Sequence, residues 1–396
     1  MSIDKTSNSN ERYEARGVSA SKQDVHAAIQ NLSAGLYPGS FCKVFPDIYG
    51  KEQDKVYLMS SDGSGTKSIL AYLQWMETGK TDSWSAIAQD VIVMNLDDLL
   101  CMGGSGPFLY TSLINRNKNR IPAEVLKAYI EGTQMFFDRM SGLGIDILYT
   151  GGETADLGDS VRTITLDATM SVRMAKENLI LTQNIKPGQV VVGLASYGKS
   201  SYEEKENSGI GSNGLTSARH ELLHAIYKEK YPETYDSQSD ASLMYCGEYK
   251  LEDQPEILGM TVAEALLSPT RSFAPILVTC FKQFPGAIHG IIHNTGGAFT
   301  KVLHYVNGVH IVKNNILPVP GIFRLIAEES KTSTEEMFKV YNCGTRMELY
   351  CDQESAENII SVAKSFQVDA QIIGYAEAYD GKKVTVLHEG NKYEYI

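Results

Sequence analysis

One segment constrains the fold of this chain more than any other: residues 84–102, read as a helix, are apolar nearly all round. A helix without a polar face is buried on every side, so this segment predicts a buried helix. It does not predict a membrane span, because a span needs about 20 apolar residues and Asn95, Asp97 and Asp98 interrupt the apolar run. Adjacent carboxylates in such a helix are costly unless they meet solvent, a basic partner or a metal. A salt-bridged or surface pair and a metal-lined cavity both satisfy this requirement.

Composition narrows the class of protein further. The chain has 396 residues, 43% of them apolar, which excludes a disordered chain and suggests two or three domains with cores of their own. The net charge of −12 argues against long-range attraction of nucleic acid. The chain can still bind a small phosphorylated ligand if backbone N–H groups and a metal supply positive charge. Six cysteines without a CxxC pair and a polar N-terminus without a signal peptide predict a cytoplasmic protein with reduced thiols.

Hydrophobic periodicity divides the chain into two halves of mixed helix and strand. Strands are expected at residues 56–60, 108–114, 147–149, 163–173 and 190–195, and helices at 67–77, 84–102 and 122–142. Because both halves mix helices and strands, the fold class is α/β or α+β. The boundary between the halves lies within residues 176–189, which gives domains at 1–176 and 177–396. The first dozen residues are expected to form a tail, residues 19–32 a short helix, and residues 202–209 and 231–253 surface insertions.

The first segment that suggests chemistry is residues 62–67, DGSGTK, between a strand and a helix. Its glycines let backbone N–H groups approach an anion, and the helix start behind them favours phosphate. Asp62 is negatively charged, so it fits a phosphate site only if a divalent cation lies between its carboxylate and the phosphate. The spacing is not that of a Walker A loop, and an ordinary turn with a solvated aspartate is the alternative.

Similar glycine-rich segments recur along the chain at residues 151–156, 212–214, 291–298 and 341–347. Two of them have a structural alternative: Ser212 or Asn213 as a helix cap, and His293 as a satisfied structural histidine. Cys343 has no neighbouring histidine or basic cluster that would lower its pKa and make it a nucleophile. Together these segments favour metal-bridged phosphate chemistry, in which positioning and electrostatics dominate. The residues alone therefore indicate a nucleotide-phosphate enzyme.

In their order and in their residues these segments resemble the motifs of phosphoribosylformylglycinamidine cyclo-ligase, the aminoimidazole ribonucleotide (AIR) synthetase family of purine biosynthesis. The family patterns DGVGTK, NDL, GGETAE, SNG with a following arginine, APTR, LTGGGF and FNCGVGM are similar to residues 62–67, 97–99, 151–156, 212–219, 268–271, 294–299 and 341–347. The resemblance spans about residues 12–379.

The resemblance implies an ATP- and Mg²⁺-dependent ligase that closes the ring of formylglycinamidine ribonucleotide to give AIR, ADP and phosphate. It also implies a homodimer in which the N-terminal halves form a joint β-barrel, C-terminal α/β domains outside it, and no nucleic-acid or membrane partner. The site is expected in the cleft between the halves.

Residue roles follow from the same resemblance. Asp62 and Asp98 are implied metal ligands, and His293 and Lys67 catalytic residues. The implied ATP and phosphate site comprises Gly63, Ser64, Gly65, Thr66, Lys67, Gly151, Gly152, Glu153 and Thr154, and the implied substrate site Ser212, Asn213, Gly214, Thr295, Gly296 and Gly297. If His293 keeps a pKa near 6.5, it can exchange a proton with the ring-closing nitrogen; the alternative is that it only binds or orients substrate.

Three departures from the family pattern bear on the implied roles. Gly211 stands where the family has a histidine, Asp97 replaces the asparagine of NDL, and the N-terminal glycine loop is short, with Lys43 as its candidate basic residue. Selenophosphate synthetase, which Cys42-Lys43 faintly resembles, and thiamine-monophosphate kinase are alternatives within the superfamily. A non-catalytic nucleotide-binding relative is the alternative from a different class.

Overall fold

The computed structural model describes Arg16, Ala28 and residues 31–396 of the chain. The expected tail at residues 1–12 and nearly all of the expected helix at 19–32 lie outside these described residues. Within the described residues, no helix has the length and apolar character needed to cross a membrane.

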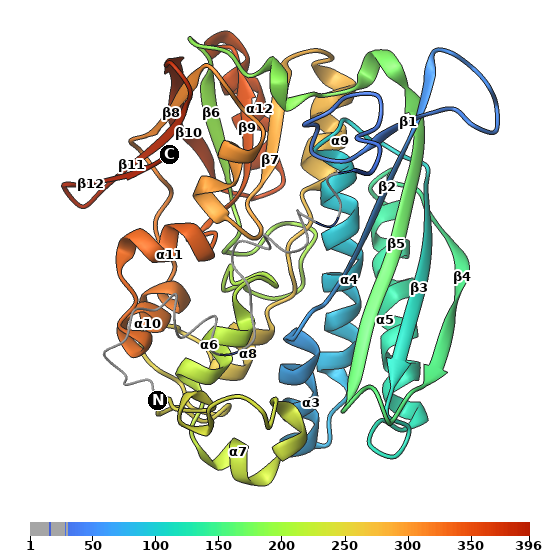
Figure 1. Cartoon of the computed structure of the whole chain (residues 1–396), viewed down its shortest axis with the longest axis vertical. Helices are drawn as coiled ribbons and strands as arrows, with labels where there is room; N and C mark the ends of the chain where they lie inside the picture. Colours follow the sequence, from blue (N-terminus) through green and yellow to red (C-terminus); the bar gives the residue numbers. More distant parts are fainter. Residues whose placement is uncertain (1–15, 17–27, 29–30) are drawn as a thin grey trace.

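The N-terminal half is a five-stranded sheet with helices on one face (Figure 1). Its strands, in spatial order, are β1 (Val44–Pro46), β2 (Lys55–Gly63), β5 (Ile164–Ala175), β3 (Phe108–Arg116) and β4 (Ile147–Asp156). Neighbouring strands are antiparallel except β3 and β4, which are parallel. The helices are α3 (Lys67–Thr78), α4 (Asp82–Leu100) and α5 (Ala123–Ser141). The alternation along β5 buries every second side chain under these helices, as the sequence predicts.

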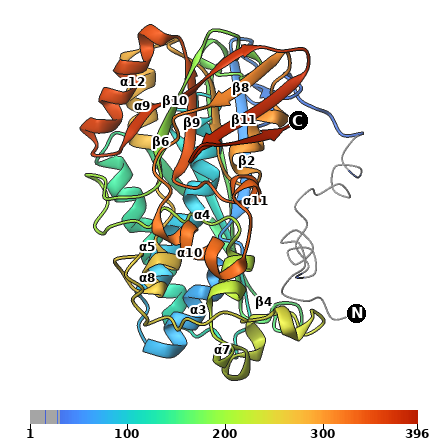
Figure 2. The ribbon, with the colours of Figure 1, turned by 90° about the vertical axis from the view of Figure 1, so that its left-hand side faces the viewer.

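The C-terminal half contains a seven-stranded mixed sheet. Its spatial order is β12 (Asn391–Tyr395), β11 (Lys382–His388), β8 (Val309–Lys313), β10 (Ala370–Ala378), β6 (Val190–Ala195), β9 (Thr345–Cys351) and β7 (Ile288–His293). Its helices are α6 (Leu215–Leu222), α7 (Ile226–Lys230), α8 (Val262–Leu267), α9 (Ala274–Gln283), α10 (Gly321–Ser330), α11 (Thr334–Val340) and α12 (Gln353–Ser365). Figure 2 shows α9 and α12 side by side next to this sheet, where α12 contacts β6 and β10.

Helix α4 is buried, as its apolar sequence predicts. It packs on β2 and β5 of its own sheet, on α5, and on α8 and α9 of the other half. Asp82 is its one exposed residue. The helix therefore joins the two halves and carries its polar residues to the boundary between them.

Two expectations about local structure are wrong. Residues 151–154 do not form a loop after a short strand: β4 continues through them, because they pair with β3 across a register shift, and Gly151 takes a φ of 106° there. The segments 202–209 and 231–253 are not simple surface insertions. They bury Asn207 and Ser208 in the first and Leu243, Met244, Tyr245 and Leu251 in the second.

Candidate active site

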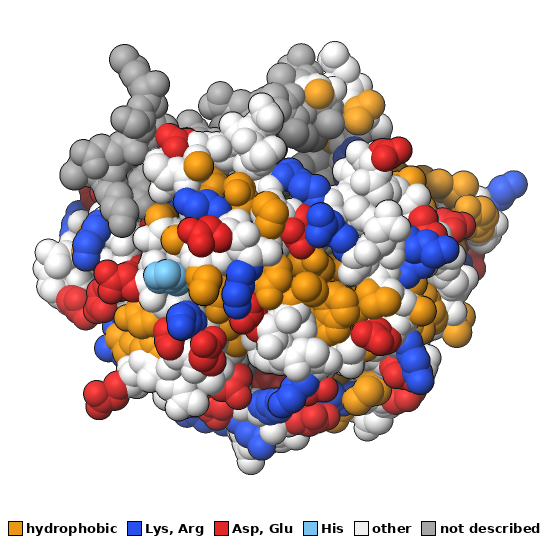
Figure 3. Space-filling model, turned by 90° about the horizontal axis from the view of Figure 1, so that it is seen from below, with side chains coloured by type: hydrophobic (Ala, Val, Ile, Leu, Met, Phe, Trp, Pro, Cys, Tyr) orange, Lys and Arg blue, Asp and Glu red, His pale blue; other side chains and the backbone are white. Residues whose placement is uncertain are grey.

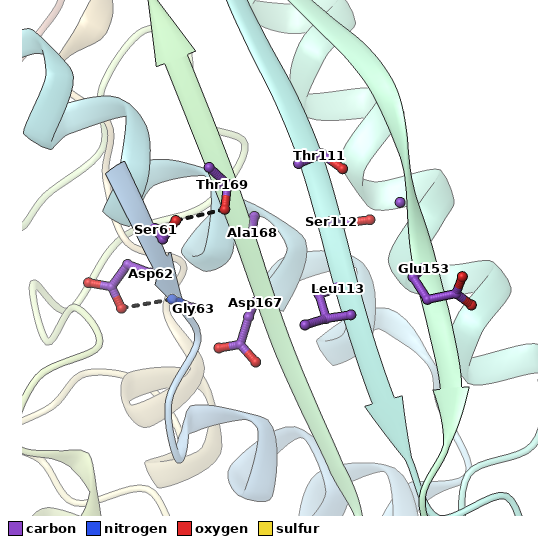
Figure 4. Close-up of a pocket in the computed structure, with 11 residues that line it drawn as sticks. Ser61, Asp62, Gly63, Thr111, Ser112, Leu113, Glu153, Asp167, Ala168 and Thr169 are labelled. Atoms are coloured by element: carbon purple, nitrogen blue, oxygen red, sulfur yellow. Dashed lines mark hydrogen bonds between the residues drawn. The ribbon is translucent and has the colours of Figure 1, made fainter. Parts of the chain in front are cut away.

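A hollow of about 720 Å³ lies on the open face of the first sheet (Figure 4). Its lining brings Asp62 and Gly63, at the end of β2, together with Gly152 and Glu153 of the edge strand β4. Asp167 of β5 lies between them, and burial raises the pKa of its carboxyl. The Asp62 carboxylate accepts a hydrogen bond from the Gly63 N–H at 2.7 Å, and Figure 4 shows Glu153 at the opposite border of the hollow. The two glycine motifs of this half thus share one concave, acidic surface.

The loop after β2 turns from this hollow toward the C-terminal half. Ser64 N–H donates to the Leu166 carbonyl, and Gly65 has the left-handed φ of 53° that the tight turn requires. The Thr66 hydroxyl lies 2.8 Å from that of Thr216 in α6. The loop therefore contacts the helix that follows the SNG motif.

Lys67 is placed differently from the expectation of a phosphate or catalytic lysine. Its ammonium is completely buried and donates to Asp90 of α4 at 2.7 Å and to the Ser268 carbonyl at 2.6 Å. The structure thus places Lys67 in a buried ion pair with Asp90 of its own half, at the boundary with the C-terminal half, rather than on a surface open to a ligand.

Asp90 also holds the SNG segment. Its Oδ1 accepts from Ser212 Oγ at 2.9 Å and from the N–H and hydroxyl of Thr270 at 3.0 and 2.5 Å. Neither Ser212 nor Asn213 caps α6, whose N-cap is Gly214 in the left-handed region without a side-chain cap, so the cap alternative is excluded. The Asn213 amide oxygen is buried without a hydrogen-bond partner among the described residues.

The paired carboxylates of α4 have separate environments. Asp97 is buried, accepts from Ser272 Oγ at 2.9 Å and from the Phe273 N–H at 3.3 Å, and burial raises its pKa to about 7. Asp98 keeps 21% of its side chain exposed and accepts from His293 Nδ1 at 2.9 Å. Only Asp98 therefore presents a carboxylate toward a ligand.

His293, at the end of β7, is locked by two partners. Arg346 Nε donates to its Nε2 at 3.1 Å, and because an arginine N–H only donates, the ring proton lies on Nδ1 and faces Asp98. Burial, followed by the charge of Arg346, lowers the pKa of His293 to about 4. The expectation of a pKa near 6.5 therefore does not hold in this structure.

The glycine turn after β7 leads into a short 3-10 helix, η5 (Ala298–His304), which carries Lys301. The Lys301 ammonium donates to Thr295 Oγ1 and lies 4.7 Å from the centre of the Phe41 ring. Burial lowers the pKa of Lys301, whereas the negative charges of Asp98 and, more weakly, Asp62 raise it. Gly297 caps η5 with a φ of 92°.

The cysteine of the N-terminal loop does not have the environment of a nucleophile. Cys42 Sγ lies 3.5 Å from the Asp98 carbonyl, and burial and then the Asp98 charge raise the pKa of its thiol well above the usual value. A thiolate is therefore disfavoured. All six cysteines are free thiols, as the sequence predicts.

The described residues contain no group of three His, Cys, Asp or Glu side chains arranged to hold a metal. Asp62 and Asp98 still fit Mg²⁺, because this ion prefers carboxylate oxygens and usually keeps waters and substrate phosphates as its other ligands. They are the residues that would hold it.

Sequence reasoning missed three residues of this region. Asp90 carried a signal, a carboxylate in an all-apolar helix, and Arg346 lay inside the motif at residues 341–347. Lys301 carried none, because only the fold of η5 brings it to Asp98.

On the face shown in Figure 3, acidic and basic side chains are interspersed rather than gathered into a basic patch.

Comparison with known proteins agrees with the two-part architecture. The family model for the AIR synthase related protein N-terminal domain matches residues 42–173, and the model for the C-terminal domain matches residues 186–387. Proteins named phosphoribosylformylglycinamidine cyclo-ligase are similar to the chain: that of Methanococcus vannielii is 28% identical over 344 residues, 85% of this chain and 84% of the relative. That of Pyrococcus furiosus is 29% identical over 309 residues, 78% and 75% of the two chains.

Solved structures share the fold at low sequence identity. A Thermus thermophilus protein has a TM-score of 0.53 at 14% identity and covers 92% of this chain and 96% of its own. Thiamine monophosphate kinase from Aquifex aeolicus has a TM-score of 0.55 at 13% identity, covering 94% and 97%. The resemblance read from the motifs is confirmed: the chain belongs to the AIR synthase related protein family, with its N-terminal domain followed by its C-terminal domain.

Proposed function

We propose that this protein is the ATP-dependent cyclo-ligase that converts formylglycinamidine ribonucleotide to 5-aminoimidazole ribonucleotide, with release of ADP and phosphate, in purine biosynthesis. The observation that carries the proposal is the contact of Asp98 with His293, which joins an N-terminal and a C-terminal family motif at 2.9 Å. The name shared by relatives that match over most of their length supports the same reaction. The free thiols support a cytoplasmic location.

We assign Asp62 and Asp98 to hold Mg²⁺ with the ATP phosphates. When bound, the ion supplies charge neutralisation to phosphate oxygens. The phosphate loop comprises Gly63, Ser64, Gly65 and Thr66, and the nucleotide surface Gly151, Gly152, Glu153 and Thr154. His293 is assigned to orient Asp98, because its two ring nitrogens are already occupied by Asp98 and Arg346.

The ribonucleotide is assigned to Ser212, Asn213 and Gly214 and to Thr295, Gly296 and Gly297 on the facing turn. Asp90 ties the first segment to Lys67, so Lys67 acts as a positioning residue. Binding in the cleft between domains 1–176 and 177–396 brings the amidine nitrogen and the activated formyl carbon together, which lowers the entropic part of the barrier.

We also propose a homodimer through the open face of the first sheet. That face exposes apolar side chains which a second copy would cover: Met59, Leu109, Leu113 and Leu148 are 55%, 46%, 43% and 60% exposed.

The test is ADP release by the purified protein with Mg²⁺-ATP, with and without formylglycinamidine ribonucleotide, while AIR is quantified in the same sample. We expect ADP and AIR in equal amounts, and ADP only when the ribonucleotide is present. ADP release that requires thiamine monophosphate or selenide instead would assign the protein to another member of the superfamily. No turnover with any of them, despite nucleotide binding, would support a non-catalytic relative.

A further inference from the structure

The Arg346 side chain crosses from β9 of the C-terminal half to α4 of the N-terminal half. Its Nε donates to His293 Nε2 at 3.1 Å, and its Nη2 lies 3.3 Å from Met94 Sδ. Only 1% of the residue is exposed. The guanidinium therefore lies at the boundary between the halves, next to the candidate site.

The charge of Arg346 is incompletely compensated. Asp97, Asp90, Asp98 and Asp62 help to keep it charged, but no carboxylate among the described residues lies within the 4.0 Å of an ion pair with it. An unpaired buried charge is costly, so it is retained where a ligand completes its coordination or where function requires it.

A second buried arginine shows what full compensation looks like in this protein. Arg271 is equally buried, but it donates to both carboxylate oxygens of Glu203 and to the carbonyls of residues 195, 197 and 198. Arg346 by contrast has a nitrogen, Nη1, that makes no hydrogen bond with any described residue. Arg271 is thus a structural arginine, whereas Arg346 has donor capacity left over.

The free side of Arg346 faces the SNG segment. A Cβ atom added to Gly211 would overlap Nη1 and lie 3.3 Å from Cζ, so the guanidinium occupies the space of a side chain at this position. Gly211 has a φ of 71°, which also favours glycine. The two residues are departures from the family pattern that face each other: glycine replaces histidine at 211, and arginine replaces the second glycine of NCGVGM at 346.

We propose that Arg346 is an oxyanion-binding residue: its Nη1 donates to a phosphate oxygen held at the 211–214 segment. The proposal rests on the proposed function and extends it to a residue at which the chain departs from the family motif. A phosphate oxygen is available from two sources, the ribonucleotide and ATP. In both cases the guanidinium supplies, in the space left by Gly211, a permanent positive charge opposite a group of carboxylates.

The experiment measures the KM for each substrate and the dissociation constants of inorganic phosphate and ADP for the wild type and Arg346→Gln. Loss of a charge-assisted hydrogen bond is expected to weaken the affected ligand by about 10- to 100-fold. If Arg346→Gln raises the KM for the ribonucleotide alone, Arg346 binds the phosphate of the ribonucleotide. If it raises the KM for ATP alone, Arg346 binds a phosphate of ATP. Arg324→Gln, on the exposed side of α10, is the matched control and should leave all four constants unchanged.

A second variant removes the possibility that a folding defect decides the result. Gly211→Ala keeps the charge but pushes the guanidinium away from its position, so it should weaken the same ligand as Arg346→Gln. If either variant is folded by circular dichroism and retains wild-type KM and phosphate affinity, the proposal is overturned. Failure of the proposed function is recognised separately, because wild-type protein would then lack turnover while the phosphate and ADP measurements still test Arg346.

Discussion

At the scale of single residues, Lys67 has two alternative roles, a structural one in the ion pair with Asp90 and a catalytic one. Its buried ammonium neutralises Asp90, which in turn holds Ser212 and Thr270. Lys67→Met leaves an uncompensated buried carboxylate, and we expect the free energy of unfolding to fall by about 3–5 kcal/mol. Urea denaturation measures it, and adding Asp90→Asn should restore part of the loss. A Lys67→Met protein of wild-type stability but without turnover would instead make Lys67 a catalytic residue.

Asp98 allows a complementary prediction about activity. Asp98→Asn keeps an oxygen for the His293 Nδ1–H but loses the charge that suits Mg²⁺. We expect turnover to fall by several orders of magnitude with little change in the melting temperature. Turnover is measured across a Mg²⁺ titration, and an unchanged rate and Mg²⁺ dependence would contradict the assignment.

These residues show how far the sequence reaches. Motif order identified Asp98 and His293, and the structure brings them into contact. The burial of a single side chain depends on tertiary packing, so the sequence did not show that Lys67 is internal or that His293 has a lowered pKa. Arg346 was missed because its meaning depends on Gly211, which only the fold places against it.

At the scale of elements, periodicity predicted α4 and β5 because each has a clear burial pattern. The edge strand β4 was misjudged because its paired glycines are typical of a turn, and the pairing that extends the strand is a tertiary contact with β3.

Asp47, in the turn after the edge strand β1, allows a prediction about how the free energy of unfolding depends on pH. A hydrogen bond from Arg173 of β5, together with N–H donors of the turn after β1, lowers the pKa of Asp47 to about 2. Because the unfolded carboxyl has a pKa of about 3.9, the stabilisation is present above pH 4 and is lost as the pH falls toward 2. We expect the unfolding free energy of Asp47→Asn to depend less on pH between 4 and 2 than that of the wild type, as measured by urea titrations. Asp54→Asn, an exposed control, should retain the wild-type slope.

At the scale of the whole molecule, the open face of the first sheet exposes apolar side chains to solvent. Sequence patterning shows that β5 has one apolar and one polar face, but it does not show that β2, β3 and β4 place apolar side chains among the polar ones of the open face. The pairing register puts Leu109 of β3 beside Leu148 of β4 there. Exposed apolar neighbours of this kind mark an interface.

The corresponding prediction concerns association in solution. A chain of 43.6 kDa that pairs through this face should sediment at about twice that mass at micromolar concentration. Leu109→Glu places a charge in the middle of the interface, where burying it unpaired is costly, so we expect the variant to sediment as a folded monomer. Met135→Glu is the matched control: Met135 is 54% exposed, close to the 46% of Leu109, but it lies on α5, which covers the opposite face of the sheet. A wild-type monomer at this concentration, or equal dissociation of both variants, would show that the open face is not where two copies meet.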